Sequence, residues 1–111
     1  MKHVIDIRDF EVPDLDAIFK ETDRMISGAP SDALKGKILA ALFYEPSTRT
    51  RLSFESAMHR LGGSVVGTEN AGEFSSAAKG ETLEDSIRVV SAYADAIVIR
   101  HPEAGSAARA A

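Results

Sequence analysis

The sequence has no cysteine, no excess of positive charge and no long apolar run, and each absence excludes a class of protein. Without cysteine, the 111-residue chain has no disulfide framework and no thiolate metal site. Its net charge of -4 argues against nucleic acid as the main partner, because surfaces that bind nucleic acid are basic. No stretch approaches the roughly 18 apolar residues of a membrane span. The first residues also lack the apolar core of a signal peptide. We therefore expect a cytoplasmic protein with no nucleic-acid or membrane partner.

Several signatures of catalysis are missing as well. No spacing of histidine, aspartate and glutamate suggests a metal site, so we expect none. The Gly-x-x-x-x-Gly-Lys phosphate loop and the Gly-x-Ser-x-Gly turn are both absent. What is present is an ordinary globular composition, with 44% hydrophobic and 27% charged residues. A chain of this length forms one domain at most.

Apolar spacing along the chain changes between helical and strand patterns. Helical spacing predicts helices over residues 12–27, 48–61 and from 82 to about 94. Short apolar runs between turn residues predict strands over residues 37–43, 64–68 and 95–100. Residues 69–80 are polar and without periodicity, which predicts a loop. A helix followed by strand–helix–strand–helix–strand predicts an α/β fold, a parallel sheet with flanking helices.

The same spacing predicts which helical side chains face the core. They are Leu15, Ile18, Phe19, Met25 and Ile26, then Phe54, Ala57, Met58 and Leu61, then Leu83, Ile87, Val90 and Ala94. Residues 82–85 resemble a capping box with Asp85 in place of glutamate. The tail, residues 104–111, is compatible with a helix but precedes no further strand. It therefore suggests a truncated domain.

Ligands of parallel α/β sheets bind outside the carboxyl ends of the strands. The loop after the first predicted strand places three hydroxyls (Ser47, Thr48, Thr50) and two guanidiniums (Arg49, Arg51) within five residues. It leads into a helix N-terminus, whose free N–H groups and partial positive charge suit an anion. Arginine adds a planar fork that fits phosphate oxygens. We therefore predict a phosphate-binding loop.

The two arginines cannot share one phosphate if both lie on the helix, because positions two apart point to nearly opposite sides. We predict that Arg49 binds the anion and that Arg51 forms a structural ion pair with Glu55. The alternative is an ordinary helix cap with solvated arginines, since capping hydroxyls are common. From the residues alone, both interpretations stay open.

Three further residues that are able to carry positive charge lie at the same predicted edge. Arg100 ends the third strand and is able to neutralise an anion or polarise a carbonyl, or simply to end a buried strand. His101 suits acid–base chemistry near neutral pH, or a turn. Lys79 lies in the long polar loop, where it either closes over an anion or remains solvated.

Three segments resemble the aspartate/ornithine carbamoyltransferase family. They are residues 43–63 (which begin Phe-Tyr-Glu-Pro-Ser-Thr-Arg-Thr-Arg), residues 79–85 (Lys-Gly-Glu-Thr-Leu-Glu-Asp) and residues 99–102 (Ile-Arg-His-Pro). Ornithine enzymes share the Ser-x-Arg-Thr-Arg core. The Phe-Tyr-Glu-Pro and Arg-His-Pro segments are more similar to the aspartate enzymes.

The resemblance implies a reaction and a set of site residues. Ser47, Thr48, Arg49 and Thr50 would bind carbamoyl phosphate, and Thr50 and Arg100 would also reach its carbonyl oxygen. Ser75 and Lys79 match a mobile loop that enters the active site of a neighbouring subunit, where Lys79 would contact phosphate and L-aspartate. The aspartate amine would attack the carbamoyl carbon to give N-carbamoyl-L-aspartate and phosphate, without a metal or organic cofactor. The resemblance also implies a homotrimer and assigns His101 to the turn.

The chain matches only the first part of the family's length. We therefore expect residues 1–111 to form an incomplete N-terminal carbamoyl-phosphate-binding domain of an aspartate carbamoyltransferase, without the aspartate-binding domain and inactive alone. One alternative is a stand-alone anion-binding module without catalysis. Others are an enzyme more like the ornithine carbamoyltransferases, and a fragment that folds poorly.

Overall fold

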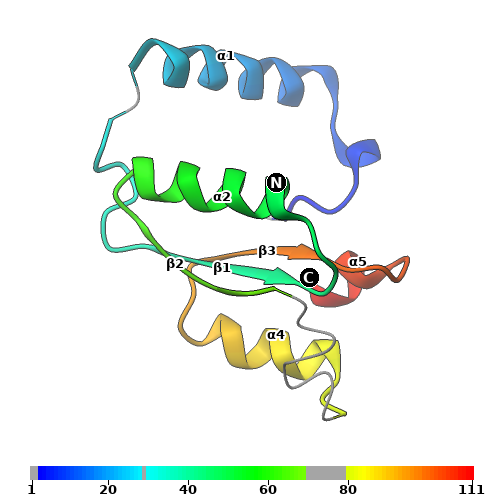
Figure 1. The fold of residues 1–111 in the computed structure, drawn as a ribbon. Coiled ribbons are helices and arrows are strands. Elements are labelled where there is room, and N and C mark those ends of the chain that lie inside the picture. Colours follow the sequence, from blue (N-terminus) through cyan, green and yellow to red (C-terminus); the bar gives the residue numbers. More distant parts are fainter. Residues whose placement is uncertain (1–2, 29, 70–79) are drawn as a thin grey trace.

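The computed structural model describes residues 3–28, 30–69 and 80–111 and has the predicted α/β architecture. Its elements in chain order are η1 (Ile7–Asp9), α1 (Val12–Gly28), β1 (Ile38–Phe43), α2 (Thr48–Arg60), β2 (Ser64–Thr68), α4 (Leu83–Ser91), β3 (Ala96–Arg100) and α5 (Ser106–Ala110). Figure 1 shows the sheet between α2 on one face and α4 on the other. All three predicted strands and all three predicted helices are confirmed, with ends that shift by up to three residues.

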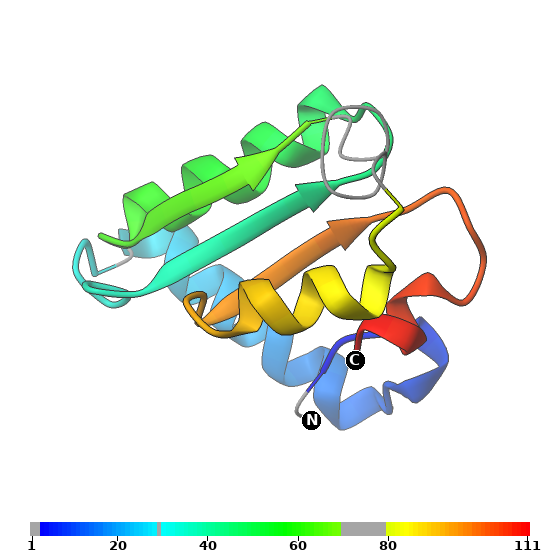
Figure 2. The ribbon, with the colours of Figure 1, turned by 90° about the horizontal axis from the view of Figure 1, so that it is seen from below.

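The sheet is parallel, with the strand order β2-β1-β3. Leu42 of β1 lies beside Thr68 of β2 and beside Ile99 of β3. Figure 2 shows the three strands pointing the same way. The parallel sheet was predicted. The central place of β1 was not, because strand order depends on contacts between segments far apart in the sequence.

The central strand supplies most of the core. Five of its six residues are buried, and Phe43 is completely so. Because strand side chains alternate between faces, Ala40 and Leu42 lie on the α4 side, where they cluster with Leu83, Ile87 and Val90. Leu39, Ala41 and Phe43 therefore lie on the α2 side. The sequence of β1 is a continuous apolar run, which is typical of parallel strands that are buried on both faces.

Two glycines allow β2 to lie close to its neighbours. A Cβ on Gly63 would lie 2.3 Å from Cε of Met58, the buried residue of α2. A Cβ on Gly67 would lie 2.7 Å from the carbonyl oxygen of Ala41 on β1. A larger residue at Gly67 would push β2 away from the backbone of β1, whereas one at Gly63 would require the flexible end of the Met58 side chain to move.

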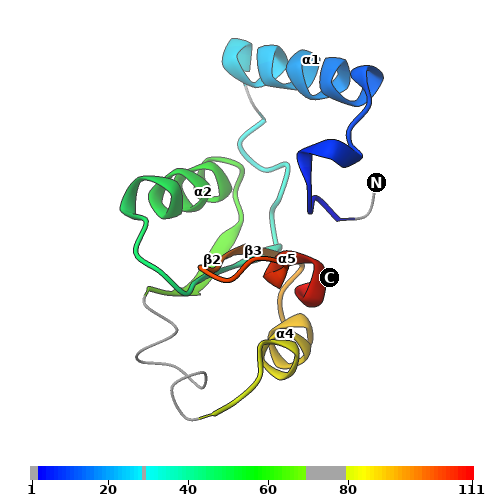
Figure 3. The same ribbon diagram turned by 90° about the vertical axis from the view of Figure 1, so that its right-hand side faces the viewer.

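The predicted core faces are right for α4 and partly wrong for the other two helices. On α4, Leu83, Ile87 and Val90 are buried as predicted. On α2, only Met58 is buried, and Phe54 remains 45% exposed. On α1, no residue is buried, and Figure 3 shows this helix standing apart from the sheet. An amphipathic pattern predicts that one face of a helix is apolar. Only the packing of the whole chain decides whether other residues bury that face.

Helix ends follow local hydrogen bonding. The Thr82 side chain accepts a hydrogen bond from the Asp85 amide at 3.2 Å and caps α4. The Asp85 carboxylate pairs with Arg88 at 3.0 Å. Residues 104–111 contain only the short helix α5, whose Arg109 pairs with Glu84 of α4. Among the described residues, no helix has the length and apolar character needed to cross a membrane.

Candidate functional site

The carboxyl ends of the three strands meet at one edge of the sheet, as predicted. Phe43 at the end of β1 lies in register with Arg100 at the end of β3. The next residue, Tyr44, donates its backbone N–H to the Arg100 carbonyl at 2.8 Å. Thr68 ends β2 on the other side of β1. The loop that joins β1 to α2 therefore starts between the ends of both neighbouring strands.

The N-terminus of α2 opens on this loop. Ser47 is the N-cap residue, but its side chain accepts no capping hydrogen bond from the helix. Its carbonyl accepts the Arg51 amide at 2.9 Å, which closes the first turn. The amides of a first turn have no acceptor within the helix, and the helix dipole makes this end positive. The ordinary capping role of the Ser47 hydroxyl is thus not realised, and the hydroxyl stays available to a ligand.

The two arginines of the loop have different surroundings. Arg51 is 27% exposed, and its Nε lies 3.7 Å from Oε2 of Glu55, which is the predicted ion pair. That Nε is buried and has no hydrogen-bond partner. Arg49 is exposed and lines a shallow hollow along the outer side of α2, with Ser56 and His59 among its neighbours. Among the described residues, only Arg51 of the two forms an ion pair.

Arg100 lies at the same edge and has a partner that was not predicted. Its Nε donates to Oε1 of Glu45 at 3.0 Å, with 46% of the Arg100 side chain and 36% of the Glu45 side chain exposed. The contact uses one of the five guanidinium donors, so the terminal nitrogens remain for other acceptors. In the sequence, Glu45 was noted only as part of the Phe-Tyr-Glu-Pro segment. The pairing of β1 with β3 brings Glu45 close to Arg100, and the sequence does not show which strands pair.

His101 shapes the turn after β3, as the resemblance implied. Its Nδ1 accepts the Glu103 amide at 3.1 Å. Its ring lies against that of Tyr44, with ring centroids 4.8 Å apart and planes tilted by 50°. The loops after β1 and β3 are therefore joined by a backbone hydrogen bond and by this aromatic contact.

Tyr44 also connects the edge to α4. Burial raises the pKa of the Tyr44 hydroxyl, a side-chain hydrogen bond with Ser86 partly offsets that rise, and the Glu81 carboxylate adds to it. A raised pKa means that the neutral phenol is favoured, because the surroundings disfavour a phenolate. Tyr44 is thus held as a neutral hydrogen-bonding group.

Two predicted site residues, Ser75 and Lys79, lie outside the described residues. In the part of the chain that is described, no group of three or more histidine, aspartate or glutamate side chains is arranged to hold a metal ion.

Residues 2–111 match the family described as aspartate/ornithine carbamoyltransferase, carbamoyl-P binding domain. The chain belongs to this family. It is 59% identical to aspartate carbamoyltransferase 2 of Pisum sativum, and the alignment covers 97% of this chain and 29% of that protein.

Solved structures agree with the family assignment. The catalytic subunit of M. jannaschii aspartate transcarbamoylase superposes with a TM-score of 0.85 at 50% identity, over 99% of this chain and 38% of that one. The Trypanosoma cruzi enzyme, solved with carbamoyl phosphate, gives 0.82 at 38% identity, over 98% of this chain and 34% of that one. The chain thus spans between 29% and 38% of the length of these relatives.

Proposed function

We propose that this chain provides the carbamoyl-phosphate side of an aspartate carbamoyltransferase active site. The observation that carries the proposal is the open N-terminus of α2, where the Ser47 hydroxyl makes no capping bond. It lies at the carboxyl edge of a parallel sheet, which is where such folds bind ligands. The similarity to aspartate enzymes favours carbamoyl phosphate as the anion.

The phosphate group is held by the first turn of α2. Ser47 and Thr48 offer hydroxyls, and the amides at residues 48–50 point out of the helix end. Arg49 supplies the permanent positive charge and Thr50 a further hydroxyl. Arg51 is engaged with Glu55 and supports the turn from the side. The different exposure of the two arginines supports these separate roles, because Arg49 is exposed and Arg51 is partly buried.

The carbamoyl carbonyl is polarised by Arg100 and Thr50. Glu45 holds the Arg100 guanidinium through Nε, which leaves its terminal nitrogens to face the carbonyl oxygen. Positive charge and hydrogen bonds placed where negative charge develops lower the barrier to attack. Glu45 is therefore a positioning residue for Arg100.

In the reaction, the amine nitrogen of L-aspartate forms a bond to the carbamoyl carbon, and the bond from that carbon to the phosphate oxygen breaks. Phosphate leaves with the electron pair and takes up the proton that the amine loses. Most of the catalysis comes from positioning and charge neutralisation. Lys79 and Ser75 are proposed, from the resemblance alone, to act in the site of a neighbouring copy, which requires an oligomer such as a trimer.

A binding titration tests the phosphate site. We expect carbamoyl phosphate, added to the isotope-labelled 111-residue chain, to shift the amide resonances of Thr48, Arg49 and Thr50. Arg49→Ala should abolish these shifts without loss of folded structure by circular dichroism. Arg51→Ala should keep the shifts but lower stability by about 1 kcal/mol, because the Glu55 carboxylate loses its partner.

Arg60→Ala is the matched control, since Arg60 is an exposed arginine at the far end of the same helix. It should change neither binding nor stability. Normal binding by Arg49→Ala would overturn the assignment of the two arginines. Shifts that occur only at other segments would overturn the phosphate site itself.

An activity assay tests the catalytic part of the proposal. The chain alone should produce no N-carbamoyl-L-aspartate, because it spans only part of its relatives' length. Mixed with a polypeptide that carries the remaining length of the M. jannaschii catalytic subunit, it should regain turnover that depends on Arg100. Robust turnover by the chain alone contradicts the proposed half-site. Saturable phosphate binding without turnover in any mixture favours an anion-binding module instead.

A further inference from the structure

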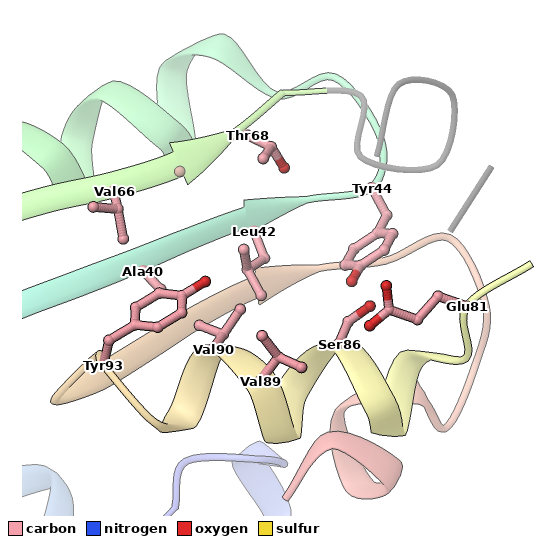
Figure 4. Close-up of a pocket in the computed structure, with 11 residues that line it drawn as sticks. Ala40, Leu42, Tyr44, Val66, Thr68, Glu81, Ser86, Val89, Val90 and Tyr93 are labelled. Atoms are coloured by element: carbon pink, nitrogen blue, oxygen red, sulfur yellow. The ribbon is translucent and has the colours of Figure 1, made fainter. Parts of the chain in front are cut away.

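A cavity of about 500 Å³ lies between the sheet and α4, on the face opposite α2. This volume is within the range of small-molecule sites, roughly 300–1,000 Å³. Figure 4 shows β1 and β2 on one side of the cavity and α4 on the other. The phosphate loop lies at the N-terminus of α2, so the cavity is a separate feature of the fold.

The walls are mostly apolar. Two strands and one helix contribute aliphatic side chains, namely Ala40, Leu42, Val66, Val89 and Val90. Tyr44 and Tyr93 add aromatic surface toward opposite ends (Figure 4). Apolar and aromatic walls with a few polar groups are typical of sites for small organic ligands.

The polar groups converge toward one end. Figure 4 shows the Tyr44 hydroxyl, the Ser86 side chain and the Glu81 carboxylate close together, and both neighbours affect the pKa of Tyr44. Thr68 also lines the cavity, and its Oγ1 is buried without a hydrogen-bond partner. A buried hydroxyl without a partner is costly, and a bound molecule with a polar group would satisfy it.

The charge of the walls indicates which ligand fits. Among the described lining residues, Glu81 is the only charged one, so the cavity disfavours anions and favours a cation. Tyrosine faces also attract cations. The phosphate loop has the opposite preference, because two arginines and a helix N-terminus surround it.

We propose that this cavity binds a small planar organic cation, such as an aromatic amidine or amine. The charged group lies beside Glu81 and the Tyr44 hydroxyl, and the ring lies between Val66 and Val89. Because Tyr44 also touches His101 and the Arg100 carbonyl, an occupant of the cavity contacts a residue of the carboxyl edge. The site does not depend on the proposed carbamoyl transfer.

Benzamidine is a suitable probe, because it is planar and positively charged. Titrated into the labelled 111-residue chain, it should shift the amides of Val66, Thr68, Ser86 and Val89 in a saturable way. A ligand this small is expected to bind with a Kd of about 1 mM. Benzoate has the same ring with the opposite charge and should cause no such shifts.

Two substitutions test the location of the site. Val89→Phe puts a larger side chain into the cavity from a position that is 58% exposed, so it should abolish benzamidine binding without unfolding the chain. Val12→Phe is the matched control on α1, where Val12 is 70% exposed, and should leave binding unchanged. Glu81→Gln should weaken binding by about fivefold, as expected for one half-exposed charge pair.

The proposal is overturned if benzamidine shifts none of the cavity amides, if benzoate shifts them equally, or if Val89→Phe binds as well as the unchanged chain. Unchanged affinity in Glu81→Gln overturns the preference for a cation. The comparison of benzamidine with benzoate uses the unchanged chain and therefore stands even if a variant fails to fold. Arg49→Ala separates the two sites, because it should remove carbamoyl phosphate binding and leave benzamidine binding intact.

Discussion

The two edges of the sheet differ in how completely their polar groups are paired. At the amino edge, Asp95 accepts the Ile38 amide at 2.8 Å through its carboxylate and donates its own amide to the Ile38 carbonyl at 2.9 Å. The Ser64 amide donates a hydrogen bond to the Lys37 carbonyl at 2.9 Å. The Lys37 Nζ lies 4.0 Å from Oδ1 of Asp95. Backbone and side chains at this edge satisfy one another.

At the carboxyl edge, some polar groups are paired, such as Arg100 with Glu45, whereas others have no partner. Ser47 makes no side-chain cap, and both Thr68 Oγ1 and Arg51 Nε are buried without a hydrogen bond. Buried polar groups are normally paired, and exceptions call for an explanation such as a missing ligand. This difference supports the proposal that the carboxyl edge binds the substrate, whereas the amino edge serves to stabilise the fold.

The largest expected effect comes from the strand that connects both edges. Phe43→Ala should lower the free energy of unfolding by about 3–5 kcal/mol, because it removes a completely buried ring from the end of the central strand. Urea unfolding followed by circular dichroism measures the loss. Val4→Ala, at a site that is 76% exposed, should change stability little. A small loss in Phe43→Ala would mean that the two edges are not held by a common core.

A smaller effect is expected at the amino edge alone. Asp95→Ala should cost about 1–2 kcal/mol of stability, because the Ile38 amide loses its charged acceptor. Carbamoyl phosphate binding should not change, since Asp95 lies at the opposite end of the strands. Asp16→Ala, an exposed position on α1, serves as the control. Loss of binding in a folded Asp95→Ala variant would break the separation between a structural and a functional edge.

The smallest effect separates two helix caps. Thr82→Ala should cost about 1 kcal/mol, because the Thr82 side chain accepts the Asp85 amide at the start of α4. Ser47→Ala should cost less than about 0.5 kcal/mol, because its side chain makes no capping bond. It should nevertheless weaken carbamoyl phosphate binding. Equal stability losses in the two variants would show that Ser47 is an ordinary cap.

Local patterns predicted the elements that depend on local physics. The periodic apolar residues of α4, the apolar run of β1 and the Thr82 cap all appear where expected. The ion pair of Arg51 with Glu55 was also predictable, because residues four apart on a helix lie on one side.

Contacts between distant segments were not predictable in the same way. The Glu45–Arg100 pair joins residues 55 positions apart and requires β1 and β3 to be neighbours. The exposed face of α1 and the exposure of Phe54 escaped prediction for a related reason. Periodicity identifies an apolar face, but the rest of the chain decides whether anything covers it.

The sequence by itself determined the α/β class, the places of the three strands and of the helices α1, α2 and α4, and the loop at residues 47–51 with its family resemblance. These follow from spacing, turn residues and short motifs, which act over a few positions of the chain. Only the tertiary structure placed β1 at the centre, joined Arg100 to Glu45, and formed the cavity between the sheet and α4. The reason is that a parallel strand pair closes a long loop, so its partners are selected by packing over the whole domain.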